Sequence, residues 1–353
     1  MSTTSAASAP ANESAEARIA RIGDGLARLL TDRWGAPVRV ENLVETSAGA
    51  RRGNVLFDAI VGDGAPQGLC ATIMPTPDIE LMPIPEEAAL IQLAEAGGMR
   101  VPHVHLATDE TQWVGGPLFV SDRVDGETVP RRVLRAGAQH GNGAALTADL
   151  GRAFAALHGL RTEDAPPSLA RPGALAPAEL ALERLAEQVD DLLQPGPVFQ
   201  LGLSWLRRHM PLPPRRLAIV HGDVRNGNII VGPQGLAAVL DWEVAKIGDP
   251  MEDLAWPCLR CWRFGQDAHE VGGFGDRQTL VDAYVEAGGS FDPVAFHWWK
   301  VLGTMRWGLG LAGQAAQHLN GSFSNIVMAA SGRRVAELEF DLLCLLEPEV
   351  DAP

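Results

Sequence analysis

The sequence predicts an α+β protein with two lobes, a small β-rich N-terminal lobe and a larger helical C-terminal lobe. Three observations support this prediction. The chain has 353 residues, which is longer than a domain with a single hydrophobic core usually is. Short β-branched or alternating segments dominate its first third, whereas helical spacing of apolar residues dominates the remainder. A short group of apolar strands interrupts the helical part.

The N-terminal lobe is predicted over residues 14–124, after an Ala- and Ser-rich stretch, residues 1–13, that we expect to be a disordered tail. Apolar residues at helical spacing predict a helix over Glu16–Trp34. A second helix over Pro85–Ala96 is indicated by its proline, by acids in its first turn and by the glycines that follow it. Five strands bounded by turn residues are predicted over Val38–Val44, Val55–Val61, Gly68–Met74, Val101–Ala107 and Pro117–Val124.

The C-terminal lobe is predicted over residues 125–353, with a hinge near residues 121–126. Its helical patterns cover Leu146–Leu160, Pro177–Leu193, Val198–His209, Leu280–Ala287, Pro293–His318 and Asn325–Leu346. Three brief apolar strands interrupt them, at Leu217–Val220, Ile229–Val231 and Ala237–Leu240. The loops of these strands carry the candidate catalytic residues.

Composition excludes several classes of protein. A net charge of −15 disfavours a nucleic-acid partner, since binding to phosphate backbones needs a concentrated Lys/Arg surface. The sequence contains no run of about 18 apolar residues, so it predicts no membrane span. Its N-terminal stretch lacks the pattern of a secretory signal. Four scattered cysteines indicate a cytoplasmic setting, and the Cys258-x-x-Cys261 pair lacks two further ligands for zinc. We expect a cytoplasmic protein with no membrane partner, and the sequence allows a homodimer.

The loop between the first two strands of the C-terminal lobe carries the strongest chemical signal. It places Asp223 and Asn228 five residues apart, and Asp241 follows the next strand thirteen residues later. Phosphoryl transfer needs a carboxylate that orients or deprotonates the acceptor hydroxyl, and hard oxygen ligands for Mg²⁺. Asp and Asn are also common turn residues, but their spacing and flanking strands favour the functional interpretation. We expect His221 to brace this loop by hydrogen bonding.

The segments Val220–Val231, Val239–Glu243 and Gly248–Trp256 resemble the aminoglycoside phosphotransferase-like family. That family shares a protein-kinase-like fold with the choline kinases. The resemblance implies a transferase that moves the terminal phosphate of ATP or GTP, with Mg²⁺, to a hydroxyl group of a small molecule.

The resemblance also assigns roles to individual residues. Asp223 would be the catalytic base, and Asn228 and Asp241 would be magnesium ligands. Asp249 and Asp253 would support the loop and the helix that begins near Met251. Backbone groups of the hinge residues Ser121, Asp122 and Arg123 would hydrogen-bond adenine.

The nucleotide-binding half departs from the family pattern. Its members place a lysine, or in some branches an arginine, on the third strand of the small lobe, but no Lys or Arg occurs between Arg52 and Arg100. The helix acid that pairs with this cation remains as Glu87. In one hypothesis Arg51 or Arg52 reaches the nucleotide phosphates, although both could be solvated turn residues. In the other, the chain is a catalytically weak or inactive relative that binds a small molecule. We prefer the working phosphotransferase, because the carboxylates of the loop are intact.

Acceptor recognition is expected from the C-terminal lobe, and the sequence leaves the acceptor open. The residues we would test first are Glu243, Trp256, His297, Trp298 and Arg306, although a tryptophan at helical spacing is more often a core residue. An aminoglycoside would call for a strongly acidic pocket. A hydroxylated metabolite, an amino sugar, a choline-like alcohol and a hydroxyacyl thioester remain open, as does the choice between ATP and GTP.

Overall fold

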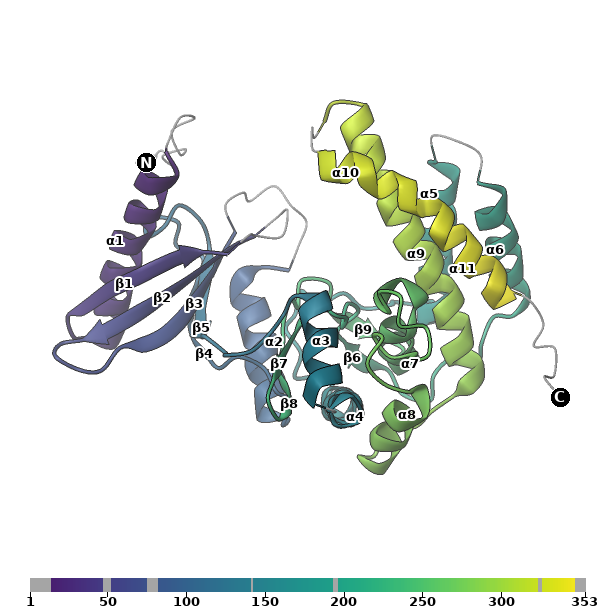
Figure 1. The fold of residues 1–353 in the computed structure, drawn as a ribbon, viewed down its shortest axis with the longest axis horizontal. Helices are drawn as coiled ribbons and strands as arrows, with labels where there is room; N and C mark the ends of the chain where they lie inside the picture. Colours follow the sequence, from purple (N-terminus) through teal and green to yellow (C-terminus); the bar gives the residue numbers. More distant parts are fainter. Residues whose placement is uncertain are drawn as a thin grey trace. The chain divides into compact units, whose positions relative to one another are not determined.

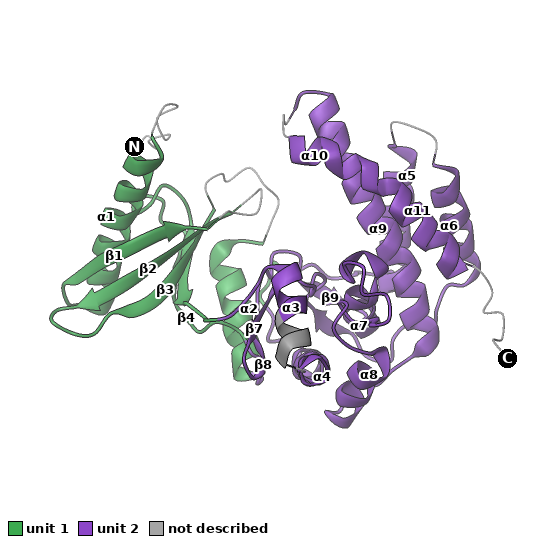
Figure 2. Cartoon of the chain, viewed as in Figure 1, with its two compact units in different colours: residues 1–96, 101–125, 166–168 green, residues 97–100, 126–165, 169–353 purple. Residues whose placement is uncertain are grey.

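A computed structural model describes residues 14–46, 52–74, 82–140, 142–192, 196–322 and 326–346 (Figure 1). The predicted tail and Arg51 lie outside these ranges. The chain forms two compact units (Figure 2), each made of several separate segments of the sequence. Unit 1 comprises residues 1–96, 101–125 and 166–168, and unit 2 comprises residues 97–100, 126–165 and 169–353. Within the described ranges, no helix is both long and apolar enough to cross a membrane.

Unit 1 is a five-stranded antiparallel sheet with two helices. Its strands are β1 (Val38–Glu45), β2 (Gly53–Val61), β3 (Gln67–Ile73), β4 (Val104–Thr108) and β5 (Leu118–Asp122), in the spatial order β1-β2-β3-β5-β4. The helices are α1 (Ala15–Trp34) and α2 (Ile84–Ala96). The side chain of Ser14 caps the start of α1, and Gly35 ends it with a positive φ of 69°.

The core of unit 1 forms where the apolar side of α1 meets the sheet. Leu26, Leu29 and Leu30 are fully buried against sheet residues such as Phe57 and Leu69. The period of α1 and the alternation of β2 and β3 thus place their apolar residues on facing surfaces. The helix and strands predicted from these patterns are confirmed.

Unit 2 is mainly helical. Its helices are α3 (Pro130–His140), α4 (Gly143–Gly159), α5 (Pro177–Asp190), α6 (Pro197–Arg208), α7 (Pro250–Ala255), α8 (Arg277–Glu286), α9 (Pro293–Leu319), α10 (Ile326–Ser331) and α11 (Val335–Leu346). Three short 3₁₀ turns cover Trp256–Cys258, Arg260–Trp262 and Gly332–Arg334. Two antiparallel strand pairs carry the candidate site: β6 (Ala218–Val220) with β9 (Lys246–Gly248), and β7 (Ile229–Gly232) with β8 (Gly235–Val239).

Three elements of unit 2 differ from the prediction. β9 was not predicted, because its residues Lys246–Gly248 include one apolar β-branched side chain and therefore form no apolar run. α3 was also missed. The single helix predicted over Asn325–Leu346 is broken by the 3₁₀ turn at Gly332–Arg334, where a glycine weakens helical propensity. The predicted α+β class, with a small β-rich part and a larger helical part, is confirmed.

Candidate active site

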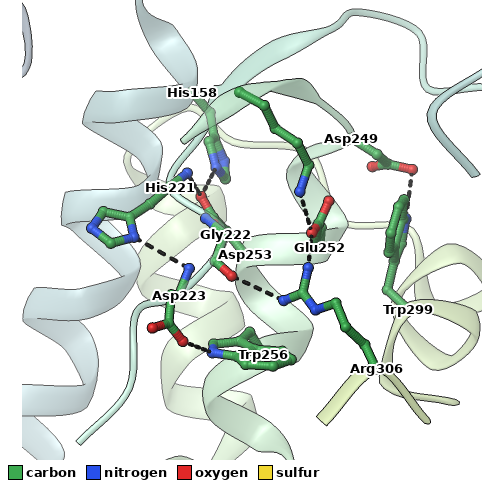
Figure 3. Close-up of polar contacts among 11 residues, drawn as sticks. His158, His221, Gly222, Asp223, Asp249, Glu252, Asp253, Trp256, Trp299 and Arg306 are labelled. Atoms are coloured by element: carbon green, nitrogen blue, oxygen red, sulfur yellow. Dashed lines mark hydrogen bonds and ion pairs between the residues drawn. The ribbon is translucent and has the colours of Figure 1, made fainter. Parts of the chain in front are cut away.

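The loop between β6 and β7 is fixed by a buried carboxylate. Asp253, fully buried on α7, accepts hydrogen bonds from the backbone N–H groups of His221 (2.8 Å) and Gly222 (2.7 Å) (Figure 3). Nε2 of His158 lies 3.1 Å from the same carboxylate. Burial opposes ionisation, but the hydrogen bond from His158 and the other donors hold the pKa of Asp253 below its ordinary value. A charged group thus holds the loop backbone at its start.

His221 links this loop to the end of β8. Its Nδ1 accepts from the backbone N–H of Asp223 (3.2 Å), and its Nε2 lies 3.1 Å from the carbonyl oxygen of Leu240. The two contacts define a neutral ring with its proton on Nε2. Burial lowers the pKa of His221, although the charges of Asp253 and Asp223 oppose the shift. The ring therefore acts as a neutral brace between two loops.

Asp223 is partly exposed, and its carboxylate is surrounded by hydrogen-bond donors. Oδ2 accepts from Nδ2 of Asn228 (2.7 Å), and the same amide donates to the Asp223 carbonyl (2.9 Å). Oδ1 accepts from Nε1 of Trp256 (2.8 Å) and from Nε of Arg225 (3.1 Å). A carboxylate offers about four lone-pair positions, so these three bonds leave one position on Oδ2. An acceptor hydroxyl could donate there.

Asp241 follows β8 and is exposed, with a positive φ of 66°. Such a backbone conformation is uncommon for a residue other than glycine, although Asp and Asn adopt it more readily than most. The N–H of Leu240 donates to the carbonyl of Asn228 (2.8 Å), which brings Asp241 beside the loop. The side-chain nitrogen Nδ2 of Asn228 donates to Asp223, so the side-chain oxygen Oδ1 of Asn228 is the atom left to coordinate a metal ion.

This donor set fits Mg²⁺, which prefers carboxylate and amide oxygens and keeps few protein ligands. Across the described ranges, no group of three or more His, Cys, Asp or Glu side chains could hold a metal ion. Cys258 and Cys261 belong to no such group. Burial raises the pKa of Cys258 to about 12.

Asp249 organises the segment before α7. Its carboxylate caps the helix by accepting from the backbone N–H of Met251 (2.9 Å), and it accepts from Nε1 of Trp299 on α9 (2.9 Å). Burial raises the pKa of Asp249, and these hydrogen bonds oppose the shift. The residue lies away from Asp223 and acts on the packing of α7 against α9 (Figure 3).

In unit 1, Arg52 and Glu87 form a buried ion pair. Arg52 immediately precedes β2, and Glu87 lies in the first turn of α2. Their side chains are only 8% and 2% exposed. The pair joins a cation beside the sheet to the helix acid that the family pattern pairs with a third-strand lysine. Arg52 is therefore not a solvated turn residue.

The hinge residues of unit 1 already use two of their backbone donors. The N–H of Asp122 donates to the carbonyl of His103 (2.9 Å), and the N–H of Arg123 donates to that of Gly68 (3.0 Å). Ser121 is buried within β5. These two N–H groups are thus engaged within unit 1, and the contact of the hinge backbone with adenine stays a prediction.

The candidate acceptor residues lie in three different environments. The structure contradicts the expectation for Trp298, which is fully buried and donates from Nε1 to the carbonyl of Leu206 (3.1 Å), as a core residue does. His297 packs edge-on against Trp205, and Glu243 is half-buried. Trp256 and Arg306 lie together beside the loop: the guanidinium carbon of Arg306 is 4.1 Å from the ring centre of Trp256.

Several residues of the site were not predicted from the sequence. Arg225 contacts Asp223, and its place two residues after the aspartate was the one available signal. Lys246 and Glu252 form an ion pair that also includes Arg306. His158 comes from α4, far away in sequence, and no local pattern marks it. Only the fold brings the side chains of Lys246, Glu252 and His158 close to the loop that contains Arg225.

A model of the phosphotransferase enzyme family matches residues 51–290. A putative aminoglycoside phosphotransferase from Ralstonia eutropha JMP134 has a similar structure, with 18% identity, a TM-score of 0.66, and coverage of 91% of this chain and 97% of that chain. A thermostable mutant of the aminoglycoside phosphotransferase APH(4)-Ia, in a ternary complex with AMP-PNP and hygromycin B, has 14% identity and a TM-score of 0.57, covering 90% and 98%. These similarities establish a shared fold.

The curated relatives are longer proteins. Acyl-CoA dehydrogenase family member 11 from Pongo abelii is 26% identical over 206 residues, which is 54% of this chain and 26% of that protein. The matches to other such relatives cover as little as 6% of their length. The family model, in contrast, covers more than half of this chain and includes the loop of Asp223 and Asn228. The chain therefore belongs to the phosphotransferase enzyme family.

Proposed function

We propose that this protein transfers the terminal phosphate of ATP or GTP, in the presence of Mg²⁺, to a hydroxyl group of a small molecule. The observation that carries the proposal is the Asp223 carboxylate, which three donors orient while one lone-pair position on Oδ2 remains. A carboxylate held in this way is what phosphoryl transfer asks of its base.

In the proposed reaction, the acceptor hydroxyl donates its hydrogen bond to Oδ2 of Asp223. Trp256 and Arg225 hold Oδ1, and Asn228 holds the other side of Oδ2, so the carboxylate has little freedom to rotate. Asp223 then receives the proton as the hydroxyl oxygen bonds to the γ-phosphorus, while the bond from that phosphorus to the bridging oxygen breaks and the nucleoside diphosphate leaves. Fixing this geometry before the reaction reduces its entropic cost.

Asn228 and Asp241 would hold the magnesium ion. When bound, Mg²⁺ offsets the negative charge that develops on the transferred phosphoryl group. The positive φ of Asp241 supports this role, because strained backbone is often retained at functional positions. Asp253 and His221 support the same loop by fixing its backbone.

Arg52 would supply the cation that the third strand lacks. Its guanidinium pairs with Glu87 in the way that the family pattern pairs a lysine with a helix acid. Guanidinium groups recognise phosphate oxygens well. This pairing favours the working enzyme over the alternative of an inactive small-molecule-binding relative, because Arg52 would substitute for the missing lysine. The AMP-PNP complex of the similar APH(4)-Ia structure agrees with a nucleotide donor.

The proposal is tested by nucleotide-dependent phosphate transfer to a panel of small alcohols, with Asp223→Asn as the key variant. We expect this variant to bind nucleotide with Mg²⁺ as wild type does, while its turnover falls by about 10²–10⁴. If wild-type protein binds neither ATP nor GTP at millimolar concentration in calorimetry, the proposed function is wrong.

A further inference from the structure

A cavity of about 160 Å³ lies in unit 2, next to residues that contact the catalytic loop. Its walls come from α5, β9, α9 and the start of α7, together with the segment that precedes α5. Apolar side chains such as Leu180, Leu302 and Trp299 form part of the lining. A lining that is mostly apolar with a few polar groups is a feature of small-molecule sites.

The charged part of the lining is basic. Four cationic side chains line the cavity, and Glu252 is its single acid, giving a formal charge of +3. The four cations are Arg171, Arg184, Lys246 and Arg306. The whole chain, in contrast, carries −15. Low-dielectric walls strengthen the positive electrostatic potential that these side chains create, so the cavity favours an anion.

Two of these cations belong to a cluster at the catalytic loop. Lys246 and Arg306 both donate to Oε1 of Glu252, at 2.6 and 2.7 Å. Arg306 also donates to the carbonyl of Gly222 (2.9 Å), the residue before Asp223 (Figure 3). The cavity therefore reaches the loop through Arg306, which also stacks on the Trp256 ring that orients Asp223.

Two groups of the lining are available to a ligand. Oε2 of Glu252 is buried and has no hydrogen-bond partner among the described residues, so it could accept from a ligand hydroxyl or amide. Arg184 is exposed on α5 and forms no hydrogen bond or ion pair with any described side chain. The cavity thus presents one acceptor, one cation that no described side chain pairs with, and an apolar wall.

We propose that this cavity holds an anionic group, a carboxylate or a phosphate ester, of the hydroxylated acceptor. The inference rests on the proposed function and narrows its substrate class. Arg184, Lys246 and Arg171 attract the anion, the apolar wall contacts the carbon skeleton, and Glu252 accepts a hydrogen bond from it. A polycationic acceptor such as an aminoglycoside is disfavoured, because it would meet the same positive side chains.

The test measures binding by calorimetry without nucleotide, using matched pairs of alcohols. Glycerol 3-phosphate is compared with glycerol, 3-hydroxybutyrate with butane-1,3-diol, and kanamycin serves as the cationic probe. We expect at least one anion to bind tenfold or more tightly than its neutral partner, and kanamycin to bind more weakly. Arg184→Glu should weaken that anion at least tenfold. The matched control is Arg208→Glu, an exposed arginine on α6 outside the cavity, and should change its affinity less than twofold.

A second arm adds ATP or GTP and measures transfer to the anion that bound. Arg184→Glu should raise KM for this acceptor with little change in kcat, since Arg184 does not contact Asp223. Equal binding of charged and neutral partners, tighter binding of kanamycin, or an unchanged affinity in Arg184→Glu would each overturn the inference. Anion binding without phosphate transfer would instead refute the proposed function and the role of the cavity as an acceptor site. Only the conclusion that the cavity binds anions would then stand.

Discussion

Arg52 and Glu87 form an ion pair that is almost fully buried inside unit 1, between the start of β2 and the first turn of α2. The pair brings a cation to the sheet beside the position from which the family pattern would supply a lysine. Strand register explains how: Gly53, the next residue after Arg52, pairs with Ile73 at the end of β3. An arginine that immediately precedes the second strand can therefore supply a cation beside the third strand, which has none.

This pairing predicts separate effects on stability and on nucleotide binding. Arg52→Met should destabilise the protein by about 3–5 kcal/mol, because removing one member of a buried ion pair is strongly destabilising. Adding Glu87→Met should recover most of that loss, since two apolar side chains replace the pair. Nucleotide affinity should stay at least tenfold reduced in both variants. Thermal unfolding and calorimetry with ATP and GTP measure the two effects.

Arg52→Lys provides the conservative control and should keep most of the nucleotide affinity. A double variant that binds nucleotide as well as wild type would show that Arg52 only stabilises the fold. The small unit would then obtain its cation elsewhere.

Trp256 predicts a kinetic effect that packing alone would not produce. Trp256→Phe removes the N–H that donates to Asp223 but keeps an aromatic ring beneath Arg306. Loss of one hydrogen bond to a charged group, worth about 1.5 kcal/mol, should lower kcat about tenfold. KM for the nucleotide should not change. Steady-state kinetics distinguishes the two parameters.

Trp262 offers a matched control in the same aromatic cluster. Its ring contacts those of Trp256 and Trp307, but its Nε1 has no hydrogen-bond partner within the described ranges. Trp262→Phe should therefore leave kcat within twofold. Equal losses in both variants would attribute the effect to packing instead of to the Asp223 hydrogen bond.

Asp241 allows charge to be separated from backbone conformation. Asp241→Asn keeps a residue type that tolerates the positive φ of 66°, so its stability should stay within about 0.5 kcal/mol of wild type. The loss of one negative charge should weaken Mg²⁺-dependent nucleotide binding at least tenfold. Calorimetry with and without Mg²⁺ measures this difference. If the nucleotide affinity of the wild-type protein does not depend on Mg²⁺, the assignment of Asp241 as a magnesium ligand is wrong.

The chemistry of the loop was predictable because it is local. Asp223, Asn228 and Asp241 lie within twenty residues, and the strands that position them show in the sequence as short apolar runs. The sheet and α1 of unit 1 were predictable for the same reason, since their apolar periods are clear.

The supporting contacts were not predictable, because they join distant segments. His158 on α4 reaches Asp253 on α7, and Arg306 on α9 reaches Gly222. Trp298 and Trp299 illustrate the limit: neighbours on one helix, both are buried, and they bond to Leu206 and to Asp249. Helical spacing alone assigns neither residue to a partner.

The depressed pKa of His221 predicts how stability changes with pH. Burial lowers this pKa from 6.5, so below pH 6.5 the unfolded chain takes up a proton that the folded protein does not. Stability should therefore fall as the pH drops below 6.5, by at most about 1.4 kcal/mol per pH unit from this residue. Asp253 has a lowered pKa as well, but its contribution is lost only as the pH falls below 3.8, in a separate window.

His221→Gln should flatten this dependence between pH 7 and pH 5, because glutamine does not titrate there. The variant should also be less stable than wild type at pH 7, since glutamine cannot make both contacts of the ring, to Asp223 and to Leu240. His209→Gln, at an exposed histidine after α6, is the control and should keep the wild-type slope. Urea unfolding at pH 7, 6 and 5 gives the three slopes. If the His221 variant retains the wild-type slope, then protonation of other groups governs acid sensitivity, and the neutral brace has no part in it.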